Sequence, residues 1–164
     1  MSYDPTIDYS QKDLSIDKNL VYWKFSELIK NLITLSSDAP RQIELVGYGA
    51  AADEMAIDFE TYYTLSYQSY LDFKLLTIDQ KIEFDELDKY LEDRSGDRNP
   101  DFWDDFKLDL NPDWNWVRLK AKNILGLLKM DDLSIDFDRT EKFDNSGNLT
   151  MQTTKTRLIK KNAS

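Results

Sequence analysis

The stretch that decides the fold class is residues 133–138, LSIDFD, in which apolar and polar side chains alternate. Residues 149–159 alternate again, and the sequence DNSGN at 144–148 between them is typical of a turn. This pattern predicts an antiparallel β-hairpin at the C-terminal end of the chain. Because an isolated hairpin is only marginally stable, we expect it to pack on helices or to join a larger sheet.

The chain before the hairpin is mostly helical in pattern. Apolar residues recur at steps of three and four over residues 20–36, and again over residues 116–128. Between these two segments, Thr77 and Gln80 form the sequence signature of a capping box, which predicts a helix from there to about residue 94. The sequence therefore predicts an α+β fold, a mostly helical domain with a C-terminal hairpin.

Two segments are harder to assign. Residues 42–46, QIELV, alternate in part and end at a glycine, so we expect a short strand there that could extend the hairpin sheet. Residues 50–76 fit both a strand and a helix in places, but their alanines and their length favour a helix broken once near residues 64–66. We predict a loosely packed N-terminal arm over residues 1–17 and a single domain over residues 18–164.

The composition restricts the chemistry that the chain can perform. Among 164 residues, 41% are apolar and 13% aromatic, and there is no histidine and no cysteine. Serine–histidine triads, thiol nucleophiles, disulfides and zinc sites with cysteine or histidine ligands are therefore excluded. We expect no cofactor and no enzymatic activity. No apolar run reaches the length of a membrane span and no signal peptide is evident, so we predict a cytoplasmic protein.

The charge is unevenly distributed along the chain. The net charge of −10 divides into −6 over residues 1–76, −8 over residues 77–113 and +4 over residues 114–164. An acidic surface repels nucleic acid and anionic lipid and attracts a basic protein. We therefore expect a basic protein partner and no binding to nucleic acid or membrane, although an acidic surface can also serve solubility alone.

Aromatic and acidic side chains come together in and just after residues 101–106, DFWDDF. Tryptophan fills a pocket or stacks on arginine, and aspartate pairs with a basic group, so this combination is typical of a surface that binds a basic protein. The alternative is that the tryptophans are core residues at helix starts. The predicted partner-binding residues are Asp101, Trp103, Asp104, Asp105, Trp114 and Trp116.

A second interpretation uses paired carboxylates as a magnesium site. Glu83 and Glu86 form an E-x-x-E pair, and Asp101 and Asp104 repeat this spacing as D-x-x-D. The pattern resembles the helical nucleotide pyrophosphohydrolases, although that family has glutamate at the start of its second pair. The resemblance implies a Mg²⁺-dependent hydrolase of a phosphorylated small molecule. On a helix, Glu54 and Asp58 would also share a face at i, i+4, and carboxylates so spaced could hold Mg²⁺. The residues of the alternative metal site are therefore Glu54, Asp58, Glu83 and Glu86.

The overall character of the chain, small and acidic with no catalytic set, resembles the immunity proteins of bacterial polymorphic toxin systems. The resemblance lies in the type of protein and rests on no particular motif. It implies a non-enzymatic inhibitor that binds a basic toxin domain, present as a monomer or a homodimer. A third interpretation is a structural domain that associates with itself through the hairpin edge.

Overall fold

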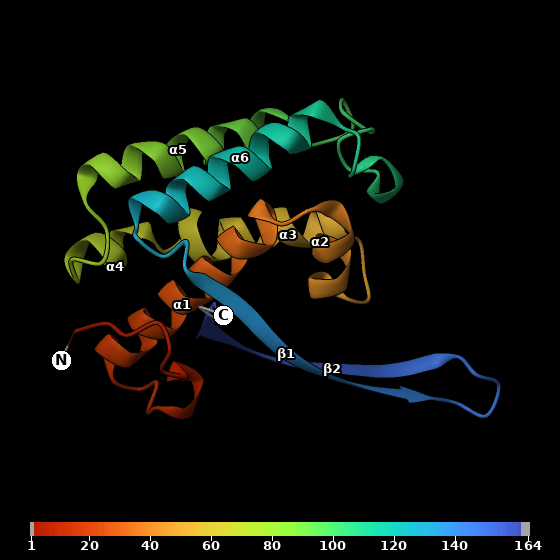
Figure 1. Cartoon of the computed structure of the whole chain (residues 1–164), viewed down its shortest axis with the longest axis horizontal. Helices are drawn as coiled ribbons and strands as arrows, with labels where there is room; N and C mark the ends of the chain where they lie inside the picture. Colours follow the sequence, from red (N-terminus) through yellow and green to blue (C-terminus); the bar gives the residue numbers. More distant parts are fainter. Residues whose placement is uncertain (1, 162–164) are drawn as a thin grey trace.

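The computed structural model describes residues 2–161, which fold into one α+β domain (Figure 1). Its helices and turns precede a C-terminal hairpin, as the periodicity predicted. The elements are η1 (Tyr9–Gln11), α1 (Asp17–Ser36), α2 (Ala39–Val46), α3 (Ala51–Phe59), the π-helical turn η2 (Glu60–Thr64), α4 (Tyr67–Asp72), α5 (Ile78–Asp93), η3 (Asp105–Lys107), α6 (Pro112–Leu127), β1 (Leu133–Phe143) and β2 (Leu149–Lys160).

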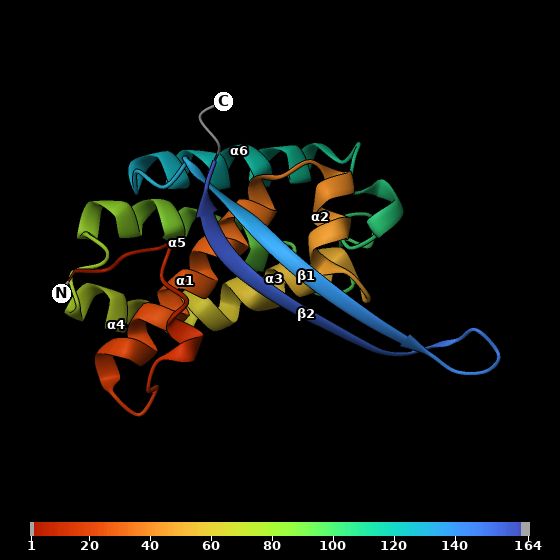
Figure 2. The same ribbon diagram turned by 60° about the horizontal axis from the view of Figure 1, so that its bottom comes forward.

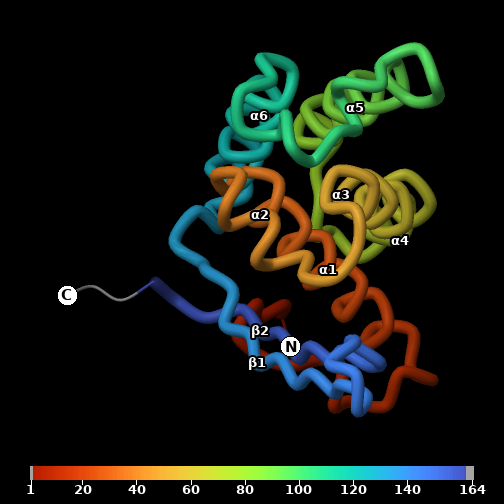
Figure 3. Tube along the Cα trace, turned by 90° about the vertical axis from the view of Figure 1, so that its right-hand side faces the viewer, coloured from red at the N-terminus to blue at the C-terminus, as the bar shows by residue number. Residues whose placement is uncertain are grey.

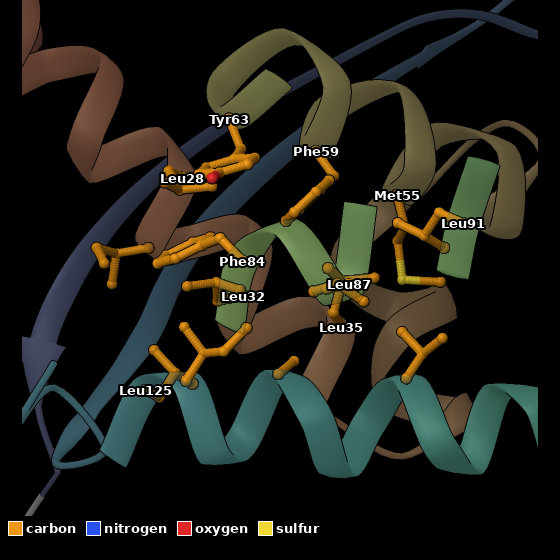
Figure 4. Packing of buried hydrophobic residues seen from close by; sticks show 14 of the residues in the cluster. Leu28, Leu32, Leu35, Met55, Phe59, Tyr63, Phe84, Leu87, Leu91 and Leu125 are labelled. Carbon is orange, nitrogen blue, oxygen red and sulfur yellow. The ribbon is translucent and has the colours of Figure 1, made fainter. Parts of the chain in front are cut away.

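The elements form three layers, with α1 in the middle. Helices α5 and α6 lie on one side of the layer that contains α1, α2 and α3, and the hairpin lies on the other side (Figures 1 and 3). Leu28, Ile29, Leu32 and Leu35 of α1 are fully buried because both outer layers cover that helix. Phe84 and Leu87 of α5 meet this leucine row in the core (Figure 4). The core therefore depends on α1 being covered from two sides.

The predicted hairpin is present, and its apolar contacts with the core lie at its base, whereas Arg139 and Gln152 further along form hydrogen bonds to Leu45 and Tyr48. The two antiparallel strands pair Ile135 with Leu158, and both side chains are buried. Beyond them the hairpin runs diagonally across the helical layer and projects past it (Figure 2), so that Phe143 and Met151 near the tip are about half exposed. Lys30 of α1 donates to the backbone carbonyl of Thr156 at 3.2 Å. This contact occupies a backbone acceptor on one edge of the hairpin. Self-association through this edge stays a prediction.

The short strand predicted at residues 42–46 is wrong, because these residues belong to helix α2. Asp38 caps that helix by accepting a 2.9 Å hydrogen bond from the backbone N–H of Arg41. Pro40 occupies the first turn, where its missing N–H costs nothing. Buried Gln42 donates to the carbonyl of Leu35 at 3.0 Å and ties α2 to α1. The sheet in the described part of the chain has two strands only.

The helical interpretation of residues 50–76 is confirmed, including the break. Helix α3 continues into the π-helical turn η2, and α4 begins after Leu65 and Ser66. The wider turn brings Tyr63 into the core, where its ring stacks on Phe84 with centroids 4.7 Å apart. Tyr63 also donates to Asp85 at 2.5 Å, which links this turn to α5.

The N-terminal segment is held at its tyrosines, so the prediction of a loosely packed arm is wrong at these positions. Tyr9 is only 4% exposed, and its ring lies edge-on to Tyr22 of α1. The hydroxyl of Tyr3 forms a 2.8 Å hydrogen bond with Ser26. The tyrosine rings are removed from water where they pack on α1. Their burial stabilises a segment that has little regular secondary structure.

No helix within residues 2–161 has both the length and the apolar composition that crossing a membrane would need.

Candidate functional site

The three tryptophans predicted to contact a partner have different surroundings. Trp114 is completely buried; its indole N–H donates to the carbonyl of Phe102 at 2.6 Å and its ring stacks on that of Phe102. Trp116 is 36% exposed and stacks on Tyr90. Trp103 is half-buried and donates to the carbonyl of Arg94 at 2.7 Å. Trp114 is therefore a core residue, and its assignment as a contact residue is wrong.

The three aspartates of the same segment stabilise the fold locally. The carboxylate of Asp105 accepts hydrogen bonds from the backbone N–H groups of Ala51 and Ala52, at 2.8 and 3.0 Å. It caps the start of α3, which has no side-chain cap of its own at Ala50. Asp104 caps η3 in the same way. Asp101 pairs with Lys107 at 2.7 Å, and this side-chain pair is largely exposed.

Two other side chains of this loop face solvent instead. Phe106 is 100% exposed and Leu110 is 86% exposed. The apolar surface of both side chains is open to contact with another molecule. The loop therefore offers apolar contacts, but from residues other than the predicted tryptophans.

Trp103 lies in an acidic groove between α3 and α5. The groove consists of two adjoining hollows of about 530 and 570 Å³, which share Asp53 and Trp103 in their walls. We use the name acidic groove for the surface formed by Asp53, Ile57, Glu60, Asp88, Leu91, Glu92, Asp97 and Trp103.

The electrostatic character of the acidic groove follows from its walls. It has five carboxylates, and none of the described residues that line it is a lysine or an arginine. The nearby guanidinium of Arg94 is paired with Asp113 at 3.0 Å and stacks over the ring of Tyr90. A hollow lined by one sign of charge concentrates the field and attracts ions of the opposite sign.

The floor of the acidic groove is apolar. Leu91 and Phe59 are buried beneath it, whereas Ile57 is 53% exposed. Trp103 adds a flat ring that is fixed by its hydrogen bond to Arg94. Fixed aromatic and aliphatic side chains surrounded by charge are typical of the centre of a protein interface. The geometry suits a segment that carries both basic and apolar side chains.

The alternative metal residues are not brought together. Glu83 and Glu86 on α5 both bind the ammonium of Lys120 on α6, whereas Glu54 and Asp58 are on α3 and line a separate cavity beneath the hairpin. Among residues 2–161, no group of three or more acidic side chains has the geometry to hold a metal ion. The four-residue magnesium site proposed from spacing is therefore wrong.

Most residues of the acidic groove were not predicted from the sequence. Its walls come from residues 53–64, 88–97 and 100–103, which are brought together only by the packing of α3 and α5. One signal was present, because Ile57 falls off the buried face that Met55 and Phe59 share. A branched apolar residue such as Ile57, off the buried face and among acidic residues, indicates a surface of this kind.

Comparisons with protein-family models, curated proteins and solved structures found no match to this chain.

Proposed function

We propose that this chain is a non-enzymatic binding protein that neutralises a basic protein partner, such as a toxin domain, by holding a basic segment of it in the acidic groove. The observation that carries the proposal is the combination of five carboxylates with Trp103 and exposed Ile57 along one groove of two adjoining hollows, whose described walls contain no basic side chain.

Charge complementarity defines the occupant. Most other acidic side chains of residues 77–113 have partners inside the molecule, such as Asp85 with Lys81 and Asp113 with Arg94. The carboxylates of Glu60, Glu92 and Asp97 belong to exposed residues on the groove rim. Carboxylates on an exposed rim speed the approach of a basic protein and select against acidic ones.

The apolar floor adds the part of the affinity that charge does not supply. Exposed ion pairs are each worth only about 0–1 kcal/mol. Burial of a leucine or phenylalanine of the partner against Ile57 and Trp103 would contribute roughly 1.5–3 kcal/mol. The preferred partner segment is therefore amphipathic, with lysine or arginine beside an apolar anchor.

A nuclear magnetic resonance titration tests where such a segment binds. The probe is a short helical peptide with a lysine face and a leucine stripe, and the control is a peptide of the same composition in scrambled order. We expect the amide shifts to concentrate on residues 53–64 and 88–103 and to be larger for the amphipathic peptide. Equal shifts with both peptides, or shifts spread over all acidic surfaces, would contradict the proposal.

The inhibitory half of the proposal needs the natural partner. A photo-crosslinking amino acid at Ile57, compared with one at exposed Thr140 on the hairpin, identifies proteins that occupy the acidic groove in cells. We expect the protein captured specifically at position 57 to be basic and to lose its activity when the purified chain is added. A captured partner that is acidic, or whose activity is unchanged, would overturn the inhibitory role.

A further inference from the structure

A second cavity, separate from the acidic groove, lies beneath the hairpin. It has a volume of about 250 Å³ and is bounded by α1, by α3 and by the end of α2, with Ile135, Thr154 and Thr156 of the two strands on its remaining side. Figure 2 shows the hairpin running across these helices. Leu45 and Met55 make part of the wall apolar.

Three carboxylates and one ammonium group belong to the residues of this wall. Glu27 and Lys30 come from α1, and Glu54 and Asp58 come from α3. Lys30 is bound to Glu27 at 2.9 Å and to the carbonyl of Thr156 at 3.2 Å, so its charge is matched by one of the three carboxylates. With all three carboxylates ionised, the wall carries a net charge of −2.

The oxygen of a buried side-chain amide in the same wall lacks a hydrogen-bond partner. Asn31 is only 5% exposed, and its Nδ2 donates to the carbonyl of Met55 at 3.0 Å. Its Oδ1 is buried and has no partner in the described part of the chain. A buried acceptor without a donor costs about 1–3 kcal/mol, and native proteins satisfy nearly all such groups. This oxygen is closed off from water, so a donor in the cavity reaches it only when the Asn31 side chain shifts.

The carboxyl of Asp58 responds to this environment. Desolvation raises its pKa to about 6, and the like charges of Glu54 and Glu27 raise it further in the same direction. A cation that approaches this carboxylate stabilises its ionised form, because the cation offsets both the repulsion from Glu54 and Glu27 and the loss of hydration.

We propose that the cavity beneath the hairpin binds a small organic cation of the alkylammonium or alkylguanidinium class. Its N–H groups donate to the carboxylates of Asp58 and Glu54 and, when the Asn31 side chain shifts toward the cavity, to Asn31 Oδ1. Its alkyl chain contacts Leu45 and Met55. A bare metal ion fits less well, because no group of three acidic side chains with metal-binding geometry occurs within residues 2–161. The wall instead pairs dispersed carboxylates with apolar surface, which suits a cation with a carbon chain.

The test is a titration of the whole chain at pH 7.5 with agmatine, which carries an ammonium and a guanidinium group on one alkyl chain. We expect saturable binding with one site, a shift of the Asn31 side-chain amide resonance and a rise in the melting temperature. Tetramethylammonium, which has the charge but no N–H donor, is the matched probe and is expected to bind at least tenfold more weakly. Equal binding of both cations would show a charge effect only and would overturn the proposal.

Two variants locate the site. Asp58→Asn removes a wall charge, and Asp138→Asn removes a charge from the exposed part of β1. We expect Asp58→Asn to weaken agmatine binding at least tenfold while the protein stays folded, and Asp138→Asn to change it less than twofold. An unchanged affinity in Asp58→Asn, or displacement of agmatine by millimolar Mg²⁺, would contradict an organic-cation site. Because these residues lie outside the acidic groove, the result is independent of the basic-protein proposal.

Discussion

The carboxylate of Asp105 caps helix α3 from a distant part of the chain, by accepting the backbone N–H of Ala51 at 2.8 Å. The same contact fixes the loop that carries Trp103 against the start of the helix that carries Ile57. One hydrogen-bonded cap therefore positions two sides of the acidic groove. Asp105 therefore has a structural role, although it lies in an acidic stretch of the sequence.

Replacement of Asp105 by alanine is expected to lower the free energy of unfolding by about 1–2 kcal/mol, since it removes a helix cap and a favourable charge at a helix N-terminus. Asp101→Ala is the matched control, because it removes only an exposed pair with Lys107 and should cost about 0–1 kcal/mol. Urea denaturation of both variants measures the difference. Equal losses of stability would show that the cap on α3 contributes no more than an exposed ion pair.

Trp114 and Trp116 are predicted to differ when each is changed to phenylalanine. Trp114→Phe leaves the buried carbonyl of Phe102 without its donor and leaves a void, so we expect a loss of about 2–4 kcal/mol. Trp116→Phe keeps a ring on Tyr90 at a partly exposed position and should cost less than about 1 kcal/mol. Thermal or urea unfolding checks both values. A larger loss in Trp116→Phe would contradict the assignment of Trp114 to the core.

Gly47 is predicted to stabilise the turn before the hairpin, chiefly through its backbone conformation. Its φ of +78° is unfavourable for other residues, and a Cβ there would lie 2.6 Å from Gln152 Oε1 and 2.9 Å from Arg139 Cζ. We expect Gly47→Ala to destabilise the protein by about 1–3 kcal/mol and to shift the resonances of the hairpin.

Gly126 provides the control for that variant, because a Cβ there meets nothing within 4 Å. It lies near the end of α6. Gly126→Ala is therefore expected to leave stability unchanged or to raise it by up to about 1 kcal/mol. If both alanine variants were equally stable, the assigned strain at position 47 would be refuted.

The raised pKa of Asp58, about 6 against 3.8 in an unfolded chain, predicts a pH-dependent cost to stability. Between these two values the folded chain binds more protons than the unfolded chain, so the free energy of unfolding falls as the pH rises from about 4 to about 6. The cavity groups that act on Asp58 are Glu54 on α3 and Glu27 on α1, with Lys30 paired to Glu27 and uncharged Thr154 and Thr156 on the hairpin side.

The variant Asp58→Asn lacks this cost. In the absence of any added cation, it is expected to melt at a higher temperature than the parent at pH 7.5, and the difference should shrink toward pH 4, where Asp58 is protonated in the folded chain. Scanning calorimetry across this range measures the effect, with Asp138→Asn, on the hairpin outside the cavity, as the control. A difference that is constant with pH, or one that grows in acid, would contradict the assigned direction.

The local pattern of the sequence was enough for most of the fold. Alternation over residues 133–138 identified the hairpin, and the steps of three and four along residues 20–36 identified α1. Residues 42–46 were misassigned because five residues are too few to separate the two periods. The better signals were Asp38 and Pro40 just before them, which are typical of a helix start.

The site was harder to predict, for two physical reasons. Trp114 was assigned to a surface although it shares a helical face with Val117 and Ala121, both of which are buried. That spacing was visible in the sequence and indicated a core position. The acidic groove, in contrast, depends on Ile57 of α3 and Leu91 of α5 lining the same hollow, and no local pattern reports which helices pack side by side.

We propose that a basic segment binds to the acidic groove in particular, and not to the acidic surface of the chain as a whole. Two triple variants with the same change in net charge test it. One reverses the groove rim (Glu60→Lys, Glu92→Lys and Asp97→Lys), and the other reverses exposed acids outside the groove walls (Asp72→Lys, Asp109→Lys and Asp138→Lys).

The most direct measurement is the dissociation constant of the amphipathic lysine–leucine peptide for these two variants, at one fixed salt concentration because screening weakens every charge interaction. We predict that the groove variant binds at least about tenfold more weakly than the parent, a loss of about 1.4 kcal/mol, while the control variant stays within about threefold. Equal weakening in both variants would show that net charge alone attracts the peptide and would contradict the account.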